Sequence, residues 1–232
     1  MKGTIALEFV PPKMEDGAAE AAEEAKKVVE LSKTCGLGGR ISHIMIPGMI
    51  EEDDDRPVEM TPRMDPLDVW NAVRQELTGT RGLCTQVTAF MDQAALNNRC
   101  NQLLESGMDG IIFVGVPRTM TDGQGGGVPP VDALSLYKEN VPNRGAILIP
   151  TRAEEIGRFK FKCERGANFA LTQLLYSDAI VPFLKEFAQA SDARPTVLLS
   201  FGYVPKTEER LKLIDWLNVI FLGSDAGEGT RD

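Results

Sequence analysis

Residues 82–115, GLCTQVTAFMDQAALNNRCNQLLESGMDGIIFVG, contain two short apolar runs that are separated by a longer helical pattern. The runs at 82–88 and 110–115 are rich in β-branched residues, which is typical of strands. Asp92 is a candidate N-cap for a helix over about 92–106. A strand, a helix and a second strand in this order predict a βαβ unit with two parallel strands.

The same alternation continues along the chain. Strands are predicted at 3–9, 41–46, 82–88, 110–115, 145–149, 168–174 and 196–201. Helices are predicted at about 16–34, 65–77, 92–106, 130–139, 153–164, 178–190 and 206–217, with Asp16 and Asp65 as further N-caps. Because of Pro182, the sixth helix either starts near Ala179 or has a distorted first turn. Seven such units favour a (β/α)₈ barrel over an open doubly wound sheet.

No linker composition divides the chain, so residues 1–217 are predicted to form one barrel domain. Residues 218–232 form a divergent tail. Its apolar run Val219–Leu222 is the only candidate for an eighth strand, and the barrel is therefore expected to be shortened and partly closed at its C-terminus, with an apolar groove beside that strand.

Composition excludes several classes of protein. The chain has 232 residues, 43% of them hydrophobic, and a net charge of −9, which argues against a nucleic-acid partner. No apolar run is long enough to span a membrane. The chain has one histidine and four cysteines without a CxxC pair, so no metal site is predicted. The scattered cysteines predict reduced thiols and a cytoplasmic protein. His43 lies among apolar residues and is predicted to occupy the core.

Glu8 is the first candidate catalytic residue. In the first strand, Ile5 and Leu7 alternate with Ala6 and Glu8, so Glu8 is predicted to point into the barrel at the C-terminal end of the strand. That end of a barrel carries the catalytic residues of such enzymes. The alternative is a structural carboxylate that pairs with a buried lysine or arginine.

The third strand offers two polar side chains. Cys84, Gln86 and Thr88 share one face, opposite Leu83, Thr85 and Val87. We expect the face with Gln86 and Thr88 to point inward near the mouth of the barrel, where both side chains would bind substrate.

Two motifs identify a family. LEFVPP at residues 7–12 ends the first strand, and GANFALTQ at residues 166–173 forms the sixth. Together they resemble the methylenetetrahydrofolate reductase family, over about residues 3–217. PGMI at 47–50 and GVPRT at 115–119 are most similar to the flavin-independent, single-domain branch of that family.

The resemblance implies a (β/α)₈ barrel that reduces methylenetetrahydrofolate to methyltetrahydrofolate, with NADH or NADPH as the hydride donor. Glu8 matches the family's acidic residue, and Gln173 matches its pterin-contacting glutamine. Flavin-dependent members carry an aspartate after the fourth strand, where this chain reads Val114-Gly115-Val116-Pro117. The departure argues against FAD, although an FAD-dependent enzyme and a non-catalytic folate-binding barrel remain alternatives.

An acid at the mouth fits this chemistry. The methylene bridge opens to an iminium cation only if the departing nitrogen receives a proton. A carboxyl group with a raised pKa supplies that proton near neutral pH, and its ionised form stabilises the cation.

Weaker candidates surround the mouth. Tyr176, together with Phe201 and Tyr203, is placed to stack on the pterin or its aminobenzoate arm, or only to pack. Backbone amides of the glycine-rich loop at 122–127 are candidates for a dinucleotide pyrophosphate, or the loop is a plain connection; its candidate residues are Gly123, Gly125 and Gly126. An acidic run follows the second strand: Glu51, Glu52, Asp53, Asp54 and Asp55. It is either a solvated loop, or one of these acids holds the cationic intermediate or a nicotinamide ribose; the sequence does not indicate which one.

Overall fold

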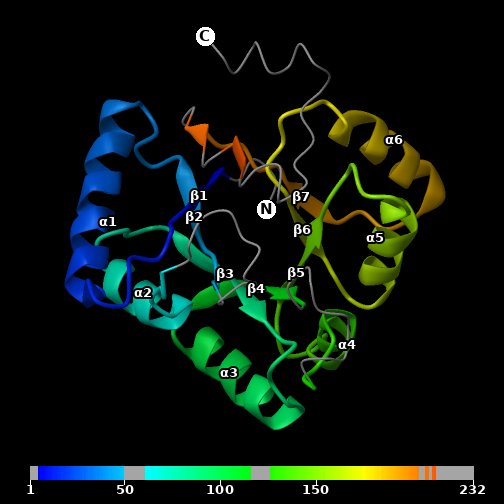
Figure 1. Ribbon diagram of the computed structural model, residues 1–232, viewed down its shortest axis with the longest axis horizontal. Coiled ribbons are helices and arrows are strands. Elements are labelled where there is room, and N and C mark those ends of the chain that lie inside the picture. The colour runs from blue at the N-terminus through cyan, green and yellow to red at the C-terminus, as the bar shows by residue number, and fades with distance from the viewer. Residues whose placement is uncertain (1–4, 50–60, 116–125, 204–206, 209–210, 213–232) are drawn as a thin grey trace.

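The computed structural model describes residues 5–49, 61–115, 126–203, 207–208 and 211–212. Seven parallel strands form one sheet in the order of the sequence, and six helices lie outside it. The sheet curls into a nearly closed barrel (Figure 1). The predicted fold class is therefore confirmed, with each helix leading from one strand to the next.

The second strand has the predicted bounds, the third to fifth begin one or two residues earlier than predicted, and the first, sixth and seventh end earlier because their polar or apolar runs extend into the turns. They are β1 (Ile5–Glu8), β2 (Ile41–Ile46), β3 (Arg81–Val87), β4 (Met108–Val114), β5 (Asn143–Leu148), β6 (Phe169–Thr172) and β7 (Thr196–Leu198). The helices are α1 (Gly17–Thr34), α2 (Pro66–Val73), α3 (Gln93–Glu105), α4 (Pro130–Leu136), α5 (Glu155–Glu164) and α6 (Ile180–Ala190).

Side-chain caps account for the starts of α2 and α3. The Asp65 carboxylate accepts a hydrogen bond from the Leu67 amide, and the Asp92 carboxylate accepts one from the Ala95 amide, both at 2.8 Å. Ala179 is the N-cap of α6, so Pro182 falls in the first turn, where it costs little. Asp16 occupies the N-cap position of α1, but the prediction that it caps is wrong, because its side chain makes no capping hydrogen bond.

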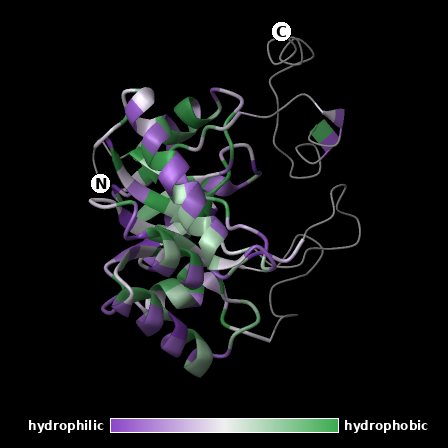
Figure 2. Cartoon of the chain, turned by 90° about the vertical axis from the view of Figure 1, so that its left-hand side faces the viewer, coloured by the Kyte–Doolittle hydropathy of each residue, from purple (hydrophilic) through white to green (hydrophobic). Residues whose placement is uncertain are grey.

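Side chains of the strands alternate between two apolar layers. The inner layer contains only strand residues: Met45, Leu83, Ile112, Phe169 and Leu198. The outer layer joins strand residues such as Ile44, Cys84 and Ile111 to residues of the surrounding helices, among them Trp70 and Leu96. Figure 2 shows the result, with hydrophilic residues on the outer surfaces of the helices.

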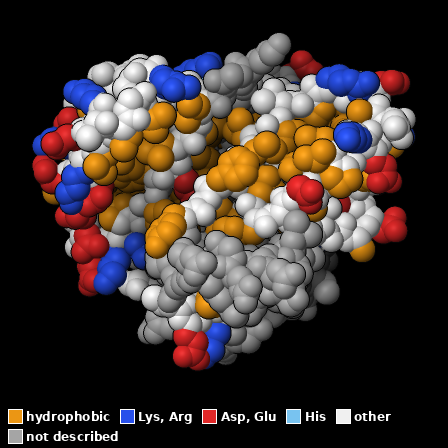
Figure 3. Space-filling view, turned by 90° about the horizontal axis from the view of Figure 1, so that it is seen from above, with side chains coloured by type: hydrophobic (Ala, Val, Ile, Leu, Met, Phe, Trp, Pro, Cys, Tyr) orange, Lys and Arg blue, Asp and Glu red, His pale blue; other side chains and the backbone are white. Residues whose placement is uncertain are grey.

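Among the described residues, no strand joins β1 to β7. Within the described residues, β1 pairs only with β2, and β7 pairs only with β6. Viewed from the side on which β1 and β7 lie, hydrophobic side chains gather between charged surfaces (Figure 3). Exposed apolar residues near these edges include Leu31 of α1 and Leu199 after β7.

The C-terminal predictions fall largely outside the described residues. Of the predicted seventh helix, residues 208, 211 and 212 are helical. The predicted eighth strand, its groove and the domain boundary at 217 cannot be placed, because residues 213–232 are not described. Among the described helices, none is long and apolar enough to cross a membrane.

A polar cluster lies at the N-terminal end of the barrel. His43 is fully buried, and its Nε2 lies 3.2 Å from the Asp109 carboxylate, to which it donates. Asp109 also accepts from Asn143 at 3.2 Å and faces Arg81. The prediction of a core histidine is confirmed. Burial lowers the pKa of His43, in spite of the opposing effect of Asp109.

We predict that His43 makes folding stability pH-dependent. Its lowered pKa means that the unfolded chain binds a proton below about pH 6.5 while the folded chain does not, so stability is lost as the pH falls. The loss approaches about 1.4 kcal/mol per pH unit, the limit for one proton. Urea unfolding at pH 7.5 and 5.5 measures it. The difference in stability between wild type and His43→Gln should change between these pH values, and a pH-independent difference would contradict the prediction.

Candidate active site

Glu8 lies on the inner side of the barrel at its C-terminal end. It pairs in register with Met45 of β2, which pairs with Leu83 of β3, and both partners belong to the inner layer. Leu7 and Phe9 pack instead in the outer layer. The inward direction predicted for Glu8 is therefore confirmed.

The Glu8 carboxyl group has no ion-pair or hydrogen-bond partner within the part of the chain that the structure describes. Solvent reaches the side chain, yet the surrounding protein partly desolvates it and raises its pKa above the ordinary value. The structural alternative, a pairing with a buried lysine or arginine, finds no support among the described residues. An inward carboxyl with a raised pKa is suited to donate a proton.

Gln173 lies at the same end of the barrel. Its backbone amide donates to the Leu148 carbonyl at 2.9 Å, which extends the β5–β6 pairing by one residue. By alternation, its side chain therefore follows Leu171 on the inner side. The side-chain amide is half-buried and makes no hydrogen bond within the described residues, so its donor and acceptor remain available.

Gln86 and Thr88 do not point into the mouth, so that prediction is wrong. They share a face with Cys84, which packs against the helices. The Thr88 hydroxyl is fully buried and donates to the Val128 carbonyl at 2.6 Å. The Gln86 side-chain oxygen Oε1 accepts from Arg99 of α3 at 2.9 Å. Both side chains therefore connect the end of β3 to the segments outside the sheet. Leu83 and Thr85 occupy the inner face in their place.

The turn after β2, which the sequence did not indicate as part of the site, contacts the neighbouring strand β3. The Gly48 amide donates to the Thr85 hydroxyl at 2.6 Å. A Cβ at Gly48 would lie 2.5 Å from the Thr85 carbonyl oxygen, so the backbone comes too close for any side chain. The Pro-Gly pair at 47–48 signals a turn, but its contact with Thr85 is visible only in the fold.

Aromatic side chains follow the strands at the mouth. Phe201 is 75% exposed and Tyr203 is 90% exposed, whereas Tyr176 is half-buried. The Tyr176 hydroxyl donates to the Gly202 carbonyl at 3.3 Å, which ties the loop after β6 to the loop after β7. Burial raises the pKa of Tyr176. Exposed rings of this kind offer flat surfaces for a planar ligand.

The remaining candidates are mostly not described. Gly123 and Gly125 lie outside the described residues, as do the five acids Glu51 to Asp55. Gly126 is exposed and has φ = +68°, and the Gly127 amide that comes next donates to the Ala89 carbonyl at 2.8 Å. This contact returns the glycine-rich loop to the end of β3. The described residues contain no group of three or more His, Cys, Asp or Glu side chains that would hold a metal ion.

Comparisons with known proteins agree with this architecture. A family model described as mycobacterial methylenetetrahydrofolate reductase matches residues 1–226. A search of curated protein sequences finds no match.

Two solved structures illustrate the likeness in fold. One is an uncharacterised protein from Clostridium thermocellum that binds two copies of 5-methyl-5,6,7,8-tetrahydrofolic acid; it is 16% identical, with a TM-score of 0.70 over 97% of this chain and 76% of that chain. The other is the tryptophan synthase α2β2 complex from Pyrococcus furiosus, at 14% identity and a TM-score of 0.55 over 92% of this chain and 83% of that chain. At such identities the likeness concerns the fold alone.

The close approach at Gly48 generates a prediction. Gly48→Ala should destabilise the protein by about 1–3 kcal/mol, because the added methyl group meets backbone atoms of Thr85 that cannot rotate away. Chemical denaturation measures the change.

Gly157→Ala in α5 is the matched control, since no atom lies within 4 Å of its new Cβ. That change should stabilise the protein by about 0.5–1 kcal/mol, as alanine favours a helix over glycine. Equal effects of the two substitutions would refute the steric explanation.

Proposed function

The chain belongs to the methylenetetrahydrofolate reductase family, and from that premise we propose that it reduces methylenetetrahydrofolate to methyltetrahydrofolate with hydride from NADH or NADPH. The observation that carries this proposal is the Glu8 carboxyl, which faces inward at the C-terminal end of β1, lacks a protein partner among the described residues and has a raised pKa. The family match alone does not indicate which residue would donate a proton, and the position and raised pKa of Glu8 support this residue.

The proposed reaction balances with one proton and one hydride. Glu8 protonates the departing nitrogen, and the carbon–nitrogen bond of the methylene bridge breaks to leave an iminium cation. The hydride of the reduced nicotinamide then adds to the methylene carbon, which becomes the methyl group, and the nicotinamide leaves oxidised. The Glu8 carboxylate that remains stabilises the cation until hydride arrives, and solvent reprotonates it afterwards.

We assign substrate recognition to side chains that follow β6 and β7, rather than to the β1 strand that carries Glu8. The Gln173 side-chain amide, which has no hydrogen bond among the described residues, suits the donor and acceptor edge of a pterin. Tyr176, Phe201 and Tyr203 come after β6 and β7 and would stack on the rings of the substrate. The folate bound by the Clostridium thermocellum protein of similar fold supports this class of ligand.

Hydride is proposed to pass directly between the two substrates. The stretch after β4 lacks the carboxylate of flavin-dependent members, which favours a reaction without FAD. Both substrates must then occupy the mouth together. An FAD-dependent enzyme and a folate-binding protein without turnover are the two alternatives, and a single assay separates both of them from this proposal.

The test is an anaerobic assay of dinucleotide oxidation with methylenetetrahydrofolate and no added flavin. We expect turnover, no absorbance near 450 nm in the purified protein, and initial-rate plots that intersect. Parallel plots would indicate a ping-pong cycle through a reduced flavin. Folate binding without dinucleotide oxidation would indicate a binding protein.

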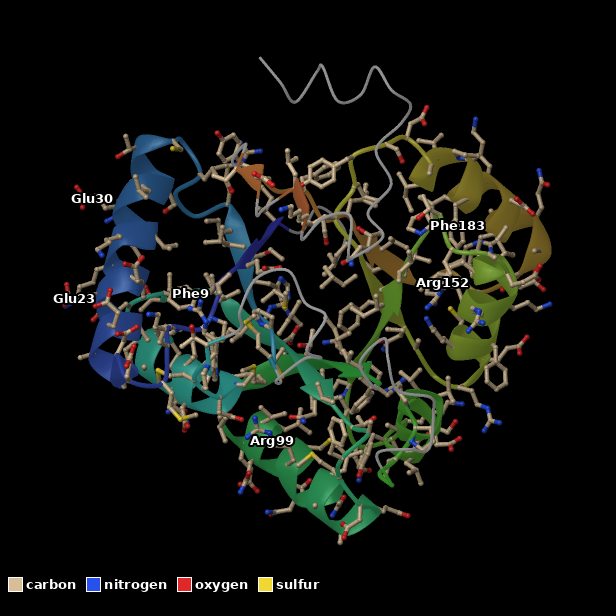
Figure 4. All side chains as sticks on the ribbon, viewed as in Figure 1. Phe9, Glu23, Glu30, Arg99, Arg152 and Phe183 are labelled. Atoms are coloured by element: carbon tan, nitrogen blue, oxygen red, sulfur yellow. The ribbon has the colours of Figure 1, made fainter. Side chains whose placement is uncertain are left out.

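Glu8→Gln keeps the shape of the side chain but removes its proton and charge. We predict a loss of rate of roughly 10²–10⁴, the usual contribution of general acid–base catalysis. The wild-type rate should also fall as the pH rises above the raised pKa of Glu8, because the proton donor is then ionised. Glu30→Gln is the control: Glu30 projects from the outer face of α1 (Figure 4) and should leave the rate unchanged. Near-wild-type turnover of Glu8→Gln would remove Glu8 from the mechanism.

Gln173→Ala should weaken folate binding by about 1–3 kcal/mol, because the pterin loses its hydrogen-bonding partner. The affinity for the dinucleotide should hardly change. Titration calorimetry with each ligand separates the two effects, and the exposed Gln102→Ala in α3 is the control. An equal loss for both ligands would point to a structural role of Gln173.

A further inference from the structure

Arg99 of α3 joins three elements near the mouth of the barrel. Its Nη2 lies 2.6 and 2.7 Å from the two carboxylate oxygens of Asp65, and its Nε donates to the Gln86 side-chain oxygen Oε1 at 2.9 Å. Only 13% of the Arg99 side chain is exposed. Figure 4 shows Arg99 on the inner side of α3, towards the strands. Asp65, Arg99 and Gln86 together form what we call the rim clamp.

The rim clamp holds the chain at the start of α2. Asp65 is the N-cap of α2, and its carboxylate also accepts from the Leu67 amide. The planar guanidinium group donates hydrogen bonds to two acceptors in a fixed geometry, so Arg99 holds Asp65 in place relative to Gln86 at the end of β3. The backbone that enters α2 is thereby tied to the sheet.

The segment just before Asp65 is paired with the segment that comes after β1. The Met64 amide donates to the Pro12 carbonyl, and the Met14 amide donates to the Pro62 carbonyl, both at 3.0 Å. Between them, Arg63 donates to the Pro11 carbonyl at 3.2 Å. This short antiparallel ladder begins three residues after Glu8. Within the described residues, contacts therefore run without a break from the rim clamp to the strand end that carries Glu8.

We propose that Arg99 is a positioning residue: through Asp65 and the ladder, it fixes the end of β1 and so holds the Glu8 carboxyl in the mouth. Among the described residues, the hydrogen-bond and ion-pair partners of Arg99 are Gln86 and Asp65, not Glu8. The effect on catalysis rests on the proposed function, whereas the effect on the ladder does not. Gln86 acts in the rim clamp as the acceptor that aligns the guanidinium.

The first test measures the ladder directly, by hydrogen exchange of the Met14 and Met64 amides in the full chain. Arg99→Met removes both polar contacts while keeping much of the apolar stem, and it should speed exchange at these two amides by about tenfold or more. Arg99→Lys should fall between this variant and wild type, because an ammonium cannot reproduce the fork. Arg74→Met is the matched control: Arg74 donates to the Ser106 carbonyl, away from the rim clamp.

Asp65→Asn separates clamping from capping. Asparagine caps a helix about as well as aspartate, so α2 should keep its start while the charge that binds Arg99 is lost. This variant decides the question if Arg99→Met does not fold. It should also speed exchange at Met14 and Met64, and unchanged exchange in it would overturn the proposal.

The second test measures the titration of Glu8 by NMR of its carboxyl carbon. In Arg99→Met and Asp65→Asn, the pKa of Glu8 should move towards its ordinary value as the strand end loosens, and kcat should fall with the KM for the dinucleotide unchanged. An unaltered Glu8 titration would refute the link to Glu8. If wild type shows no turnover, the proposed function fails, while the exchange and titration results still decide the role of Arg99.

Discussion

The site depends on how the inside of the barrel is filled. Phe169 of β6 projects into the inner layer, and its ring lies 2.5 Å from the place where a Cβ at Gly145 would stand. The ring therefore occupies space that glycine leaves open on the neighbouring strand. Leu171 continues the inner layer beyond Phe169 on β6, and at the C-terminal end of the barrel the alternation of β1 and β6 brings Glu8 and Gln173 to the inner side.

The two ends of the barrel differ in whether their polar side chains have hydrogen-bond partners. At the N-terminal end, the buried His43 is satisfied by Asp109, which also binds Asn143. At the C-terminal end, Glu8 and the Gln173 amide have no partners among the described residues. Satisfied polar groups stabilise a fold, and unsatisfied ones near solvent are available to a ligand. The contrast separates scaffold from candidate site without reference to any relative.

Much of this was predictable from the sequence, and the failures have physical reasons. Apolar runs and helix caps predicted the element order, and alternation within β1 predicted the direction of Glu8. Alternation within β3 failed, because it defines two faces but does not say which is inner. Cys84 is small and apolar enough for the helix layer, and Leu83 fills the interior, so Gln86 and Thr88 point outward. The contacts of Gly48 with Thr85, and of Arg99 with Asp65 and Gln86, join distant segments and leave no local pattern.

The order of strand pairing also bears on how the chain folds. Every strand pairing in the described residues joins consecutive strands, so none of these pairings has to bring β1 and β7 together. Each strand pairing then costs the loop-closure entropy of a single crossover, so the relative contact order is low for a parallel sheet. Each βα unit can add to the one before it, much as repeats stack in a solenoid. Among the described strands, β1 thus needs only its neighbour β2 to pair, so the candidate acid Glu8 can be positioned before the later βα units are added.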